Sequence, residues 1–349
     1  MIKYNNKNIG NIFIGNKQIG KVYNGSKLVW QHKTTPDSPV YPDDEIHYKS
    51  QNNVVIDVSI PNMISNQYVP ELDHNVIKFS GTLTTLPNSF MQSNTDLLEF
   101  IHMPYTVTQV GNNCFDGCQK MYFINMAPFE NVEEIGNRFL ALCYGITEIS
   151  FKNLKNIKKL GSDFLFDCTG LIKVDLSSFT EITEIKDNFI RGCSSLQHID
   201  LTPMSKVETI GGYVLTYNGA LKTVDMSTFT SLKKIGSSFL YTPSKELEMV
   251  KFNFPNLTEI GQSFLGSTRH ETLDFSTFTS LEKVGTMWTR PTVRNLIIDM
   301  DKVFTLLSNI NPSMYSDSKI YVPDNLVEDY KQQIPNFASY YRPLSEYNN

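Results

Sequence analysis

The most regular feature of the chain is a pair made of an aliphatic residue and, in most copies, a glycine. It returns with a period of 25, shortened once to 24, and Leu86 extends the series toward the N-terminus. The copies are Val110-Gly111, Ile135-Gly136, Leu160-Gly161, Ile185-Lys186, Ile210-Gly211, Ile235-Gly236, Ile260-Gly261 and Val284-Gly285. In most copies an aromatic residue follows four residues later, as at Phe139 and Phe164. A fixed period of this length is the signature of a repeat architecture.

A second hydrophobic unit, of the form L-x-x-φ-x-φ with φ apolar, precedes each of these pairs. Its clearest copies are Ile146/Ile149/Phe151, Leu171/Val174/Leu176, Leu196/Ile199/Leu201, Leu221/Val224/Met226 and Leu247/Val250/Phe252. Apolar and polar residues alternate over its last three positions. This is the pattern of a short strand with one buried and one exposed face.

The two periodic units predict a single elongated domain of stacked coils. One repeat unit is too small to bury its own apolar side, whereas stacked units bury it against each other in one continuous core. We count about eleven coils between Ile77 and Ile320. The length of 349 residues would by itself favour about two domains, and the repeat overrides that expectation. We therefore expect a mainly β solenoid.

Four cysteines share one position of the repeat. Cys118, Cys143, Cys168 and Cys193 recur at the repeat period, and Asn94 and Asn218 occupy the same register. One interpretation is a metal or redox site. The other is an inward ladder of small side chains, in which asparagine caps backbone groups where cysteine is absent. We favour the structural ladder, because a zinc site gathers its ligands on one ion and here each coil supplies one cysteine. We expect no metal and no cofactor.

The repeat resembles the BspA-type leucine-rich repeat family. The family pattern is roughly F-x-x-C-x-x-L-x-x-I-x-φ, and Phe164, Cys168, Leu171, Val174 and Leu176 match it. The resemblance covers residues 46–322, with residues 46–81 similar to the irregular entry cap seen before such repeats. It implies a leucine-rich-repeat solenoid with short parallel strands on two sides of a flattened coil. Members of the family are mostly adhesive surface proteins, and such repeats also occur in phage-encoded proteins.

Residues 6–25 hold a separate repeat of ten, in which Asn6–Gly15 is followed by the similar Asn16–Gly25. Asn24-Gly25 is a hairpin turn signal, so we expect short β-strands joined by tight turns. The segment resembles the N-terminal module of phage virion proteins, which implies that residues 1–31 dock onto a particle. An N-terminal cap of the solenoid is the alternative. The apolar docking candidates are Ile9, Ile12, Phe13, Ile14, Ile19, Val22, Tyr23, Leu28, Val29 and Trp30.

The segments that flank the repeat differ from it in composition. Residues 32–45 contain three prolines and no apolar period, which predicts a semi-rigid linker. Residues 323–349 begin with proline and acidic residues in what reads as a first helical turn, and Leu326, Val327 and Tyr330 form an apolar stripe. We expect this segment to be a helical cap that closes the open end of the core.

Composition and charge exclude several classes of partner. The formal net charge is −5 with no run of Lys or Arg, so we expect neither nucleic-acid binding nor attraction to anionic membranes. No apolar run is long enough to predict membrane insertion. The segment from Met1 to Gly20 lacks the pattern of a secretory signal. Five cysteines, an odd number, favour a reducing compartment.

Catalytic signatures are absent from the sequence. It contains no GxSxG, HExxH, P-loop or GxGxxG motif, and its six histidines are scattered with at most one in each coil. A regular solenoid offers a flat surface where catalysis needs a concave pocket with convergent polar groups. We therefore do not expect an enzyme; a polysaccharide-degrading enzyme is the least favoured alternative.

The exposed positions of the L-x-x-φ-x-φ unit are the candidate ligand face. They are Phe123, Glu148, Lys173, His198, Thr223, Met249 and Thr272, beside a column formed by Asp175, Asp200, Asp225 and Asp274. Side chains at fixed intervals suit a repeating ligand such as a glycan, or an extended protein surface. The opposing interpretation is a solvated surface without a ligand. For the aspartates, cation binding between coils competes with hydrogen bonding to turn amides, which we favour.

Together these features predict a non-enzymatic phage virion protein, a tail or head fibre or another receptor-binding appendage. Its expected partners are other virion proteins and a glycan or protein of the host surface, and a homo-oligomer remains open. A bacterial cell-surface adhesin of the same repeat family is the alternative, and it would place the protein at the cell surface instead of in the virion.

Overall fold

The computed structural model describes residues 41–242, 247, 249–266, 268–285, 292–303 and 313–347, together with the backbone of six short strands between residues 3 and 31. The chain divides into two compact units, Met1–Pro42 and Asp43–Asn349. In the described part of the chain, no helix has the length and apolar content that crossing a bilayer requires.

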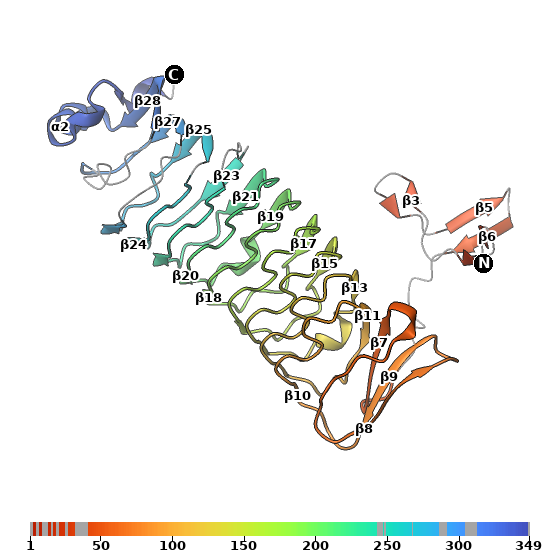
Figure 1. The fold of residues 1–349 in the computed structure, drawn as a ribbon. Coiled ribbons are helices and arrows are strands. Elements are labelled where there is room, and N and C mark those ends of the chain that lie inside the picture. Colours follow the sequence, from red (N-terminus) through yellow and green to blue (C-terminus); the bar gives the residue numbers. More distant parts are fainter. Residues whose placement is uncertain are drawn as a thin grey trace. The chain divides into compact units, whose positions relative to one another are not determined.

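The N-terminal unit contains three antiparallel hairpins (Figure 1). Its strands are β1 (Lys3–Tyr4), β2 (Lys7–Asn8), β3 (Phe13–Ile14), β4 (Lys17–Gln18), β5 (Lys21–Asn24) and β6 (Lys27–Gln31). They pair as β1 with β2, β3 with β4 and β5 with β6. Asn24 pairs with Lys27 at the end of the last hairpin, as the Asn-Gly turn signal predicts. The strands lie in the segment where the sequence predicts short hairpins.

An antiparallel sheet begins the second unit. It contains β7 (Glu45–Ser50), β8 (Met63–Val69) and β9 (His74–Phe79), and β7 also pairs antiparallel with the first repeat strand, β11 (Leu97–His102). A short 3₁₀ turn, η1 (Gln51–Asn53), follows β7. Residues 46–81, expected to be an entry cap, thus contain an antiparallel sheet that precedes the parallel coils. The sheet pairs with the backbone edge of the first coil, which would otherwise be left open.

Two rows of short parallel strands, each divided into several hydrogen-bonded sheets, form the solenoid (Figure 1). We call them the short and the long ladder. The short ladder, at the aliphatic–glycine pairs, comprises β10 (Thr85–Leu86), β12 (Gln109–Val110), β14 (Glu134–Ile135), β16 (Lys159–Leu160), β18 (Glu184–Ile185), β20 (Thr209–Ile210), β22 (Lys234–Ile235), β24 (Glu259–Ile260) and β26 (Lys283–Val284). The long ladder comprises β11, β13 (Phe123–Ile124), β15 (Glu148–Ser150), β17 (Lys173–Asp175), β19 (His198–Asp200), β21 (Thr223–Met226), β23 (Met249–Phe252), β25 (Arg269–Asp274) and β27 (Thr292–Ile297). The 3₁₀ turns η2 (Ala127–Phe129) and η3 (Thr202–Met204) connect the ladders in two coils.

The solenoid has about nine turns, so the expected count of eleven was too high. The two outermost coils of that count belong to the caps. Ile77 lies in β9, which runs antiparallel within the entry sheet, and Ile320 lies in β28 (Ser313–Val322), which pairs with the C-terminal cap. Both strands place two apolar residues two positions apart, Ile77 and Phe79 in β9 and Ile320 and Val322 in β28, as the repeat does. Hydrophobicity alone therefore does not separate them from true coils.

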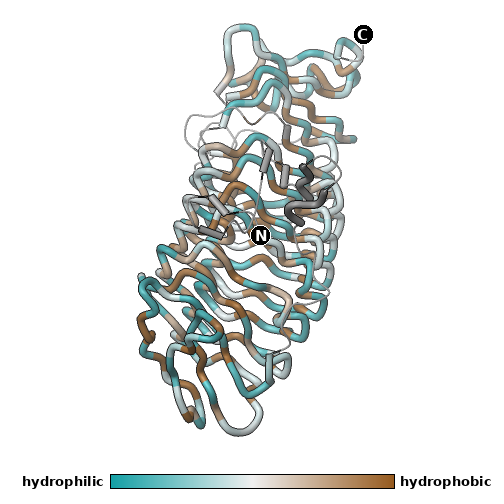
Figure 2. Tube along the Cα trace, turned by 90° about the vertical axis from the view of Figure 1, so that its right-hand side faces the viewer, coloured by the Kyte–Doolittle hydropathy of each residue, from teal (hydrophilic) through white to brown (hydrophobic). Residues whose placement is uncertain are grey.

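The core is continuous along the stack, as the repeat predicts. Figure 2 shows hydrophobic and hydrophilic segments alternating along each coil and recurring from one coil to the next. The rings of Phe139, Phe164 and Phe189 stack in successive turns with centroids 5.8 and 5.6 Å apart, and Phe115 joins this column despite its offset of one residue. Each coil therefore buries its apolar side on its neighbours.

The C-terminal cap contains one α-helix, as expected. The segment runs through η4 (Asp324–Leu326), α2 (Val327–Gln333), η5 (Pro335–Phe337), β29 (Tyr341–Pro343) and η6 (Leu344–Glu346), and β29 pairs with β28. Tyr330 and Tyr341 are buried, with ring centroids 5.3 Å apart, whereas Tyr347 is exposed. Burial raises the pKa of Tyr341. The cap thus covers the last strand with aromatic side chains.

Candidate ligand-binding face

The strand face is the outward side of the long ladder between β13 and β25. Parallel pairing places Glu148 opposite Lys173, and His198 opposite Thr223. The His198 ring nitrogen Nδ1 lies 2.9 Å from the Thr223 hydroxyl oxygen. Successive residues of a strand point to opposite sides, so the residues that follow Glu148, His198 and Thr223 point inward. These residues, Ile149, Ile199 and Val224, are buried.

The remaining candidates of this row lie at its two ends. Phe123 is 47% exposed on β13, and Thr272 is exposed on β25. The backbone of Met249 pairs with Thr223, but its side chain lies outside the described residues. The structure therefore brings Glu148, Lys173, His198 and Thr223 together in the middle of the face.

Two shallow depressions cover this middle part. The first, of about 540 Å³, is lined by Glu148, Lys173, Asp175 and Asp200, among others. The second, of about 460 Å³, lies over Lys173, His198, Thr223 and Asp225. Their walls combine carboxylates, an ammonium group and an imidazole over an apolar floor that includes Val174. Such a surface can hydrogen-bond a polar ligand across several turns.

The aspartates form a second row beside the first, and each caps the turn that follows its strand. Asp175 Oδ1 accepts from the Ser177 amide, and Asp200 Oδ1 accepts from the amide and hydroxyl of Thr202. Asp225 and Asp274 accept from the amides of Ser227 and Ser276 in the same way. These are the hydrogen bonds to turn amides that we favoured over cation binding for the aspartates.

The aspartate row is not a continuous acidic column. Lys251 stands between Asp225 and Asp274, and its Nζ lies 3.5 Å from the Asp225 carboxylate. The Ser150 hydroxyl donates to Asp175 at 2.6 Å and lowers the pKa of that carboxyl group. Among the described residues, no group of three or more His, Cys, Asp or Glu side chains is arranged to hold a metal ion.

The short ladder presents a different surface, which is covered by ion pairs between turns. Lys158 and Lys159 contact Glu133 and Glu134 of the preceding coil at 2.8 and 2.6 Å. Further pairs of this kind are Lys206–Glu181, Lys233–Glu208 and Lys234–Glu259. These side chains satisfy one another, so the short ladder is a solvated face with fewer free groups for a ligand than the strand face.

The cysteine position is buried and donates hydrogen bonds to the adjacent coil. Cys118, Cys143, Cys168 and Cys193 each direct the thiol at a backbone oxygen 27 or 28 residues earlier, at 2.9 to 3.2 Å. Asn218 does the same with its amide nitrogen, at 2.8 Å from the Ile190 oxygen. Asn94 instead accepts from the amides of Asp96 and Leu97. Burial raises the pKa of Cys118 to about 12, which keeps this thiol protonated and a donor.

The docking candidates are only partly covered by the structure. The backbone of Phe13 and Ile14 belongs to β3, that of Val22 and Tyr23 to β5, and that of Leu28, Val29 and Trp30 to β6. Ile9, Ile12 and Ile19 lie outside the described residues.

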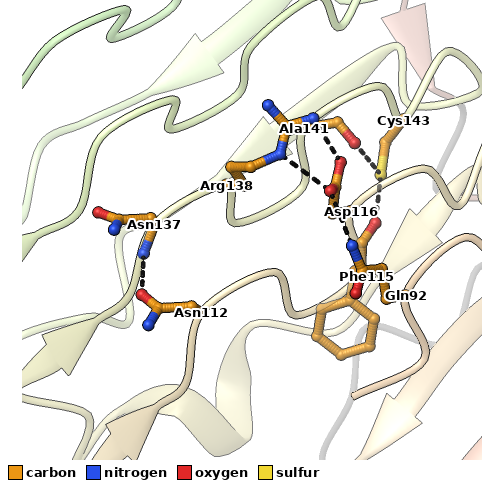
Figure 3. Close-up of polar contacts among 8 residues, drawn as sticks. All are labelled: Gln92, Asn112, Phe115, Asp116, Asn137, Arg138, Ala141 and Cys143. Atoms are coloured by element: carbon orange, nitrogen blue, oxygen red, sulfur yellow. Dashed lines mark hydrogen bonds and ion pairs between the residues drawn. The ribbon is translucent and has the colours of Figure 1, made fainter. Parts of the chain in front are cut away.

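The hydrophobic pattern did not predict the turn edge, which consists of the loops between the short-ladder strands and the cysteine position. The backbone there has positive φ at ordinary residues such as Arg138, Leu140 and Leu142. Figure 3 shows the Asn112 side chain accepting a hydrogen bond from the Asn137 amide of the next turn. It also shows the Arg138 guanidinium donating two hydrogen bonds, of 2.9 and 3.0 Å, to the Asp116 carboxylate. The signal available in the sequence was the asparagine that follows the landmark at residues 88, 112 and 137.

The repeat of this chain matches a protein-family model. A model described as a BspA type leucine rich repeat region matches residues 84–218 and 177–287, which together span more than half of the chain. No curated protein sequence matches.

Two solved structures show similarity to this chain. A leucine-rich repeat protein from Bacteroides ovatus is 15% identical over 87% of this chain and 99% of its own, with a TM-score of 0.37. The functional domain of InlJ from Listeria monocytogenes, which includes a cysteine ladder, is 15% identical over 62% of this chain and 50% of its own, with a TM-score of 0.26. The family match and the regular coil period agree, and the chain belongs to the BspA-type leucine-rich repeat family.

Proposed function

We propose that this protein is a non-enzymatic adhesion protein, which binds a glycan or an extended protein of a cell surface through its strand face. The observation that carries the proposal is the row Glu148, Lys173, His198 and Thr223, which lies in register over two adjoining depressions. The short ladder also has a depression, but its volume of about 400 Å³ is smaller than either of these, and lysines and glutamates of neighbouring turns pair with one another along that face.

The regular spacing of the face suits a ligand that repeats. Each coil adds one strand, and neighbouring strands lie about 4.8 Å apart, so polar groups recur at a constant interval. A single site of this kind is shallow and binds weakly. Several copies of the protein on one particle or cell would convert weak contacts into firm attachment through avidity.

We further propose that the N-terminal unit docks the protein onto a phage virion, as part of a tail or head fibre or another receptor-binding appendage. Its repeat of ten and its three hairpins differ from the solenoid, and the unit divides from it after Pro42. Isolated two-stranded hairpins are marginally stable in water, so a partner surface would stabilise them. The proline-rich segment after them suits an anchor that carries a reaching arm.

The strand-face proposal is tested by cell binding. The labelled full-length protein is compared with the double substitution Lys173→Glu and His198→Glu, and with Lys159→Glu on the short ladder as the matched control. We expect the double variant to lose at least about tenfold in affinity and the control to bind as the unaltered protein does. Equal binding of all three would exclude the strand face.

The docking proposal is tested by mass spectrometry of purified phage particles from the source. We expect peptides of the full-length protein in the particles, and their loss when residues 1–31 are deleted. Absence of the full-length protein from particles, together with its recovery from a bacterial surface fraction, would establish the alternative of a bacterial cell-surface adhesin. Retention of the truncated protein would place attachment in the solenoid.

A further inference from the structure

Four successive turns of the turn edge carry an aromatic cluster, which comprises Phe166, Arg191, Tyr213, Tyr217 and Tyr241. The Arg191 guanidinium lies 5.1 and 5.3 Å from the ring centroids of Tyr213 and Tyr217, and 5.5 Å from that of Phe166. The ring of Tyr217 meets that of Tyr241 edge to face at 5.8 Å. The Arg191 cation thus contacts three aromatic rings and holds them together in one surface, which we call the platform.

The platform is held in place by the backbone. The Tyr213 amide donates to the Ser237 oxygen at 2.7 Å, and the Tyr217 amide donates to the Tyr241 oxygen at 2.9 Å. Both tyrosines have positive φ, 60° and 61°. Ser238 and Gly192 occupy the same two register positions in neighbouring turns with φ of 59° and 77°, so this backbone does not require an aromatic side chain.

The two tyrosines nevertheless face solvent. Tyr213 is 45% exposed and Tyr217 is 47% exposed. Large apolar surface left in water on a rigid support is a common mark of an interaction site. The rings therefore form a pre-ordered surface that loses little entropy on binding.

Polar groups border the rings. Asn188 accepts from Arg191 Nη1 at 2.9 Å, which fixes the guanidinium. The carboxylate of Asp167 lies against the backbone of Gly192, where a Cβ atom would stand 1.8 Å from its Oδ1. Around the platform, Arg138 is paired with Asp116, and Arg191 interacts with the carboxylates of Asp163 and Asp167. The surroundings therefore carry a small negative excess, which does not attract an acidic ligand.

The platform is small. At about 150–250 Å² for a whole aromatic side chain, two half-exposed tyrosines offer roughly 200 Å². A stable protein interface buries about 800 Å² on each partner. In the turns on either side of the cluster, the equivalent positions hold Arg138, Ala141, Leu142, Ser263 and Gly266, none of which is aromatic. This area is enough for a ligand of a few small rings and too small for an interface with a folded protein.

We propose that the aromatic cluster is a binding site for a neutral oligosaccharide. A sugar ring presents C–H groups on its faces, which would stack on Tyr213 and Tyr217, and hydroxyl groups at its edge, which would hydrogen-bond Asn188, Arg191 and Asp167. The site lies on the turn edge and is separate from the strand face. It therefore goes beyond the proposed function, and either one can fail without the other.

The test uses the full-length protein and an array of neutral and acidic oligosaccharides, followed by calorimetric titration of each neutral compound that binds. The test variant combines Tyr213→Ser with Tyr217→Gly, residues that the chain itself uses at these positions in neighbouring turns. The matched control is Tyr144→Ser, because Tyr144 is 41% exposed and lies outside the cluster. Melting temperatures establish that each variant is folded, and Tyr217→Gly alone replaces the double variant if that one unfolds.

We expect neutral oligosaccharides to bind the unaltered protein, at least about tenfold weaker binding to the double variant, and unchanged binding to Tyr144→Ser. Equal binding to the double variant would overturn the inference. Binding of acidic oligosaccharides alone would also overturn it. The same holds if the unaltered protein binds no neutral oligosaccharide of the array and neither glucose, galactose nor mannose at millimolar concentration. Adhesion lost in the Lys173→Glu/His198→Glu variant but kept in the double tyrosine variant would support the strand face alone.

Discussion

At the scale of single residues, the cysteine position links five coils to the coil before them. In these coils its side chain is small and donates a hydrogen bond to the previous coil, as Cys168 and Asn218 do. The position was visible in the sequence because the same residue type recurs once in each of four successive coils. The carbonyl oxygens that accept the bonds were not visible, since backbone acceptors leave no mark on residue type.

Substitution of this position tests its role as a donor. Cys168→Ala removes the 2.9 Å bond to the Leu140 oxygen and leaves that buried acceptor without this partner. We expect a loss of about 1–3 kcal/mol in the free energy of unfolding, measured in urea. An unchanged urea midpoint would show that the bond contributes nothing.

A second prediction at this scale concerns the glycine of the landmark pair. A Cβ atom at Gly161 would lie 2.4 Å from the backbone of Gly136 and Asn137 in the previous turn. Gly161→Ala should therefore cost about 1–3 kcal/mol, because the turns must move apart. Gly219→Ala is the matched control, since its Cβ atom would meet nothing within 4 Å, and its melting temperature should stay unchanged. Equal melting temperatures for the two variants would contradict close packing at the landmark.

At the scale of elements, the entry sheet buries a histidine cluster. His47 Nδ1 lies 2.7 Å from His74 Nε2, and its Nε2 lies 2.9 Å from Glu45, which also pairs with Lys78. The His102 ring packs against His47 with centroids 5.7 Å apart. Burial lowers the pKa of His47 to about 4, and the neighbouring histidines act in the same direction. The pKa of His270, in β25, is lowered to about 4 by burial as well.

These histidines predict a stability that depends on pH. Above the ordinary pKa of 6.5, both the folded and the unfolded forms are neutral. Between pH 6.5 and 4 the unfolded chain takes up protons that the folded chain excludes, so stability falls as the pH falls through this window. We expect a lower melting temperature at pH 4.5 than at pH 7.5, and a smaller fall in His270→Gln. A melting temperature that is flat over this range would contradict the burial of these rings.

The elements also show where sequence reasoning succeeded and where it stopped. The ladder strands followed from the sequence, because every coil buries the same apolar positions. The turn edge did not, because residues as different as Leu140, Ile190 and Tyr213 share a positive φ there. Hydrogen bonds between turns impose that conformation, and it is not an intrinsic preference of those residues. The rings gathered by Arg191 were missed for the same reason.

At the scale of the whole molecule, the caps decide whether the open core is protected. The C-terminal cap buries Tyr330, Ile334, Phe337 and Tyr341 against the last strands. Deletion of residues 323–349 should expose the apolar end of the stack, and we expect concentration-dependent association in size-exclusion chromatography. The control is Tyr347→Ala in the full-length chain, which should elute as the unaltered protein does. A truncated protein that elutes as the control does at all concentrations would show that the cap is dispensable.

The central claim is that the strand face makes the adhesive contact, and hydroxyl-radical footprinting tests it most directly. The full-length protein is oxidised alone and when bound to cells, and the modified side chains are mapped by mass spectrometry. We predict protection of Phe123 and His198 on the strand face, with no change at Tyr105, which is exposed in the turn after β11. Unprotected Phe123 and His198 on bound protein would contradict the account.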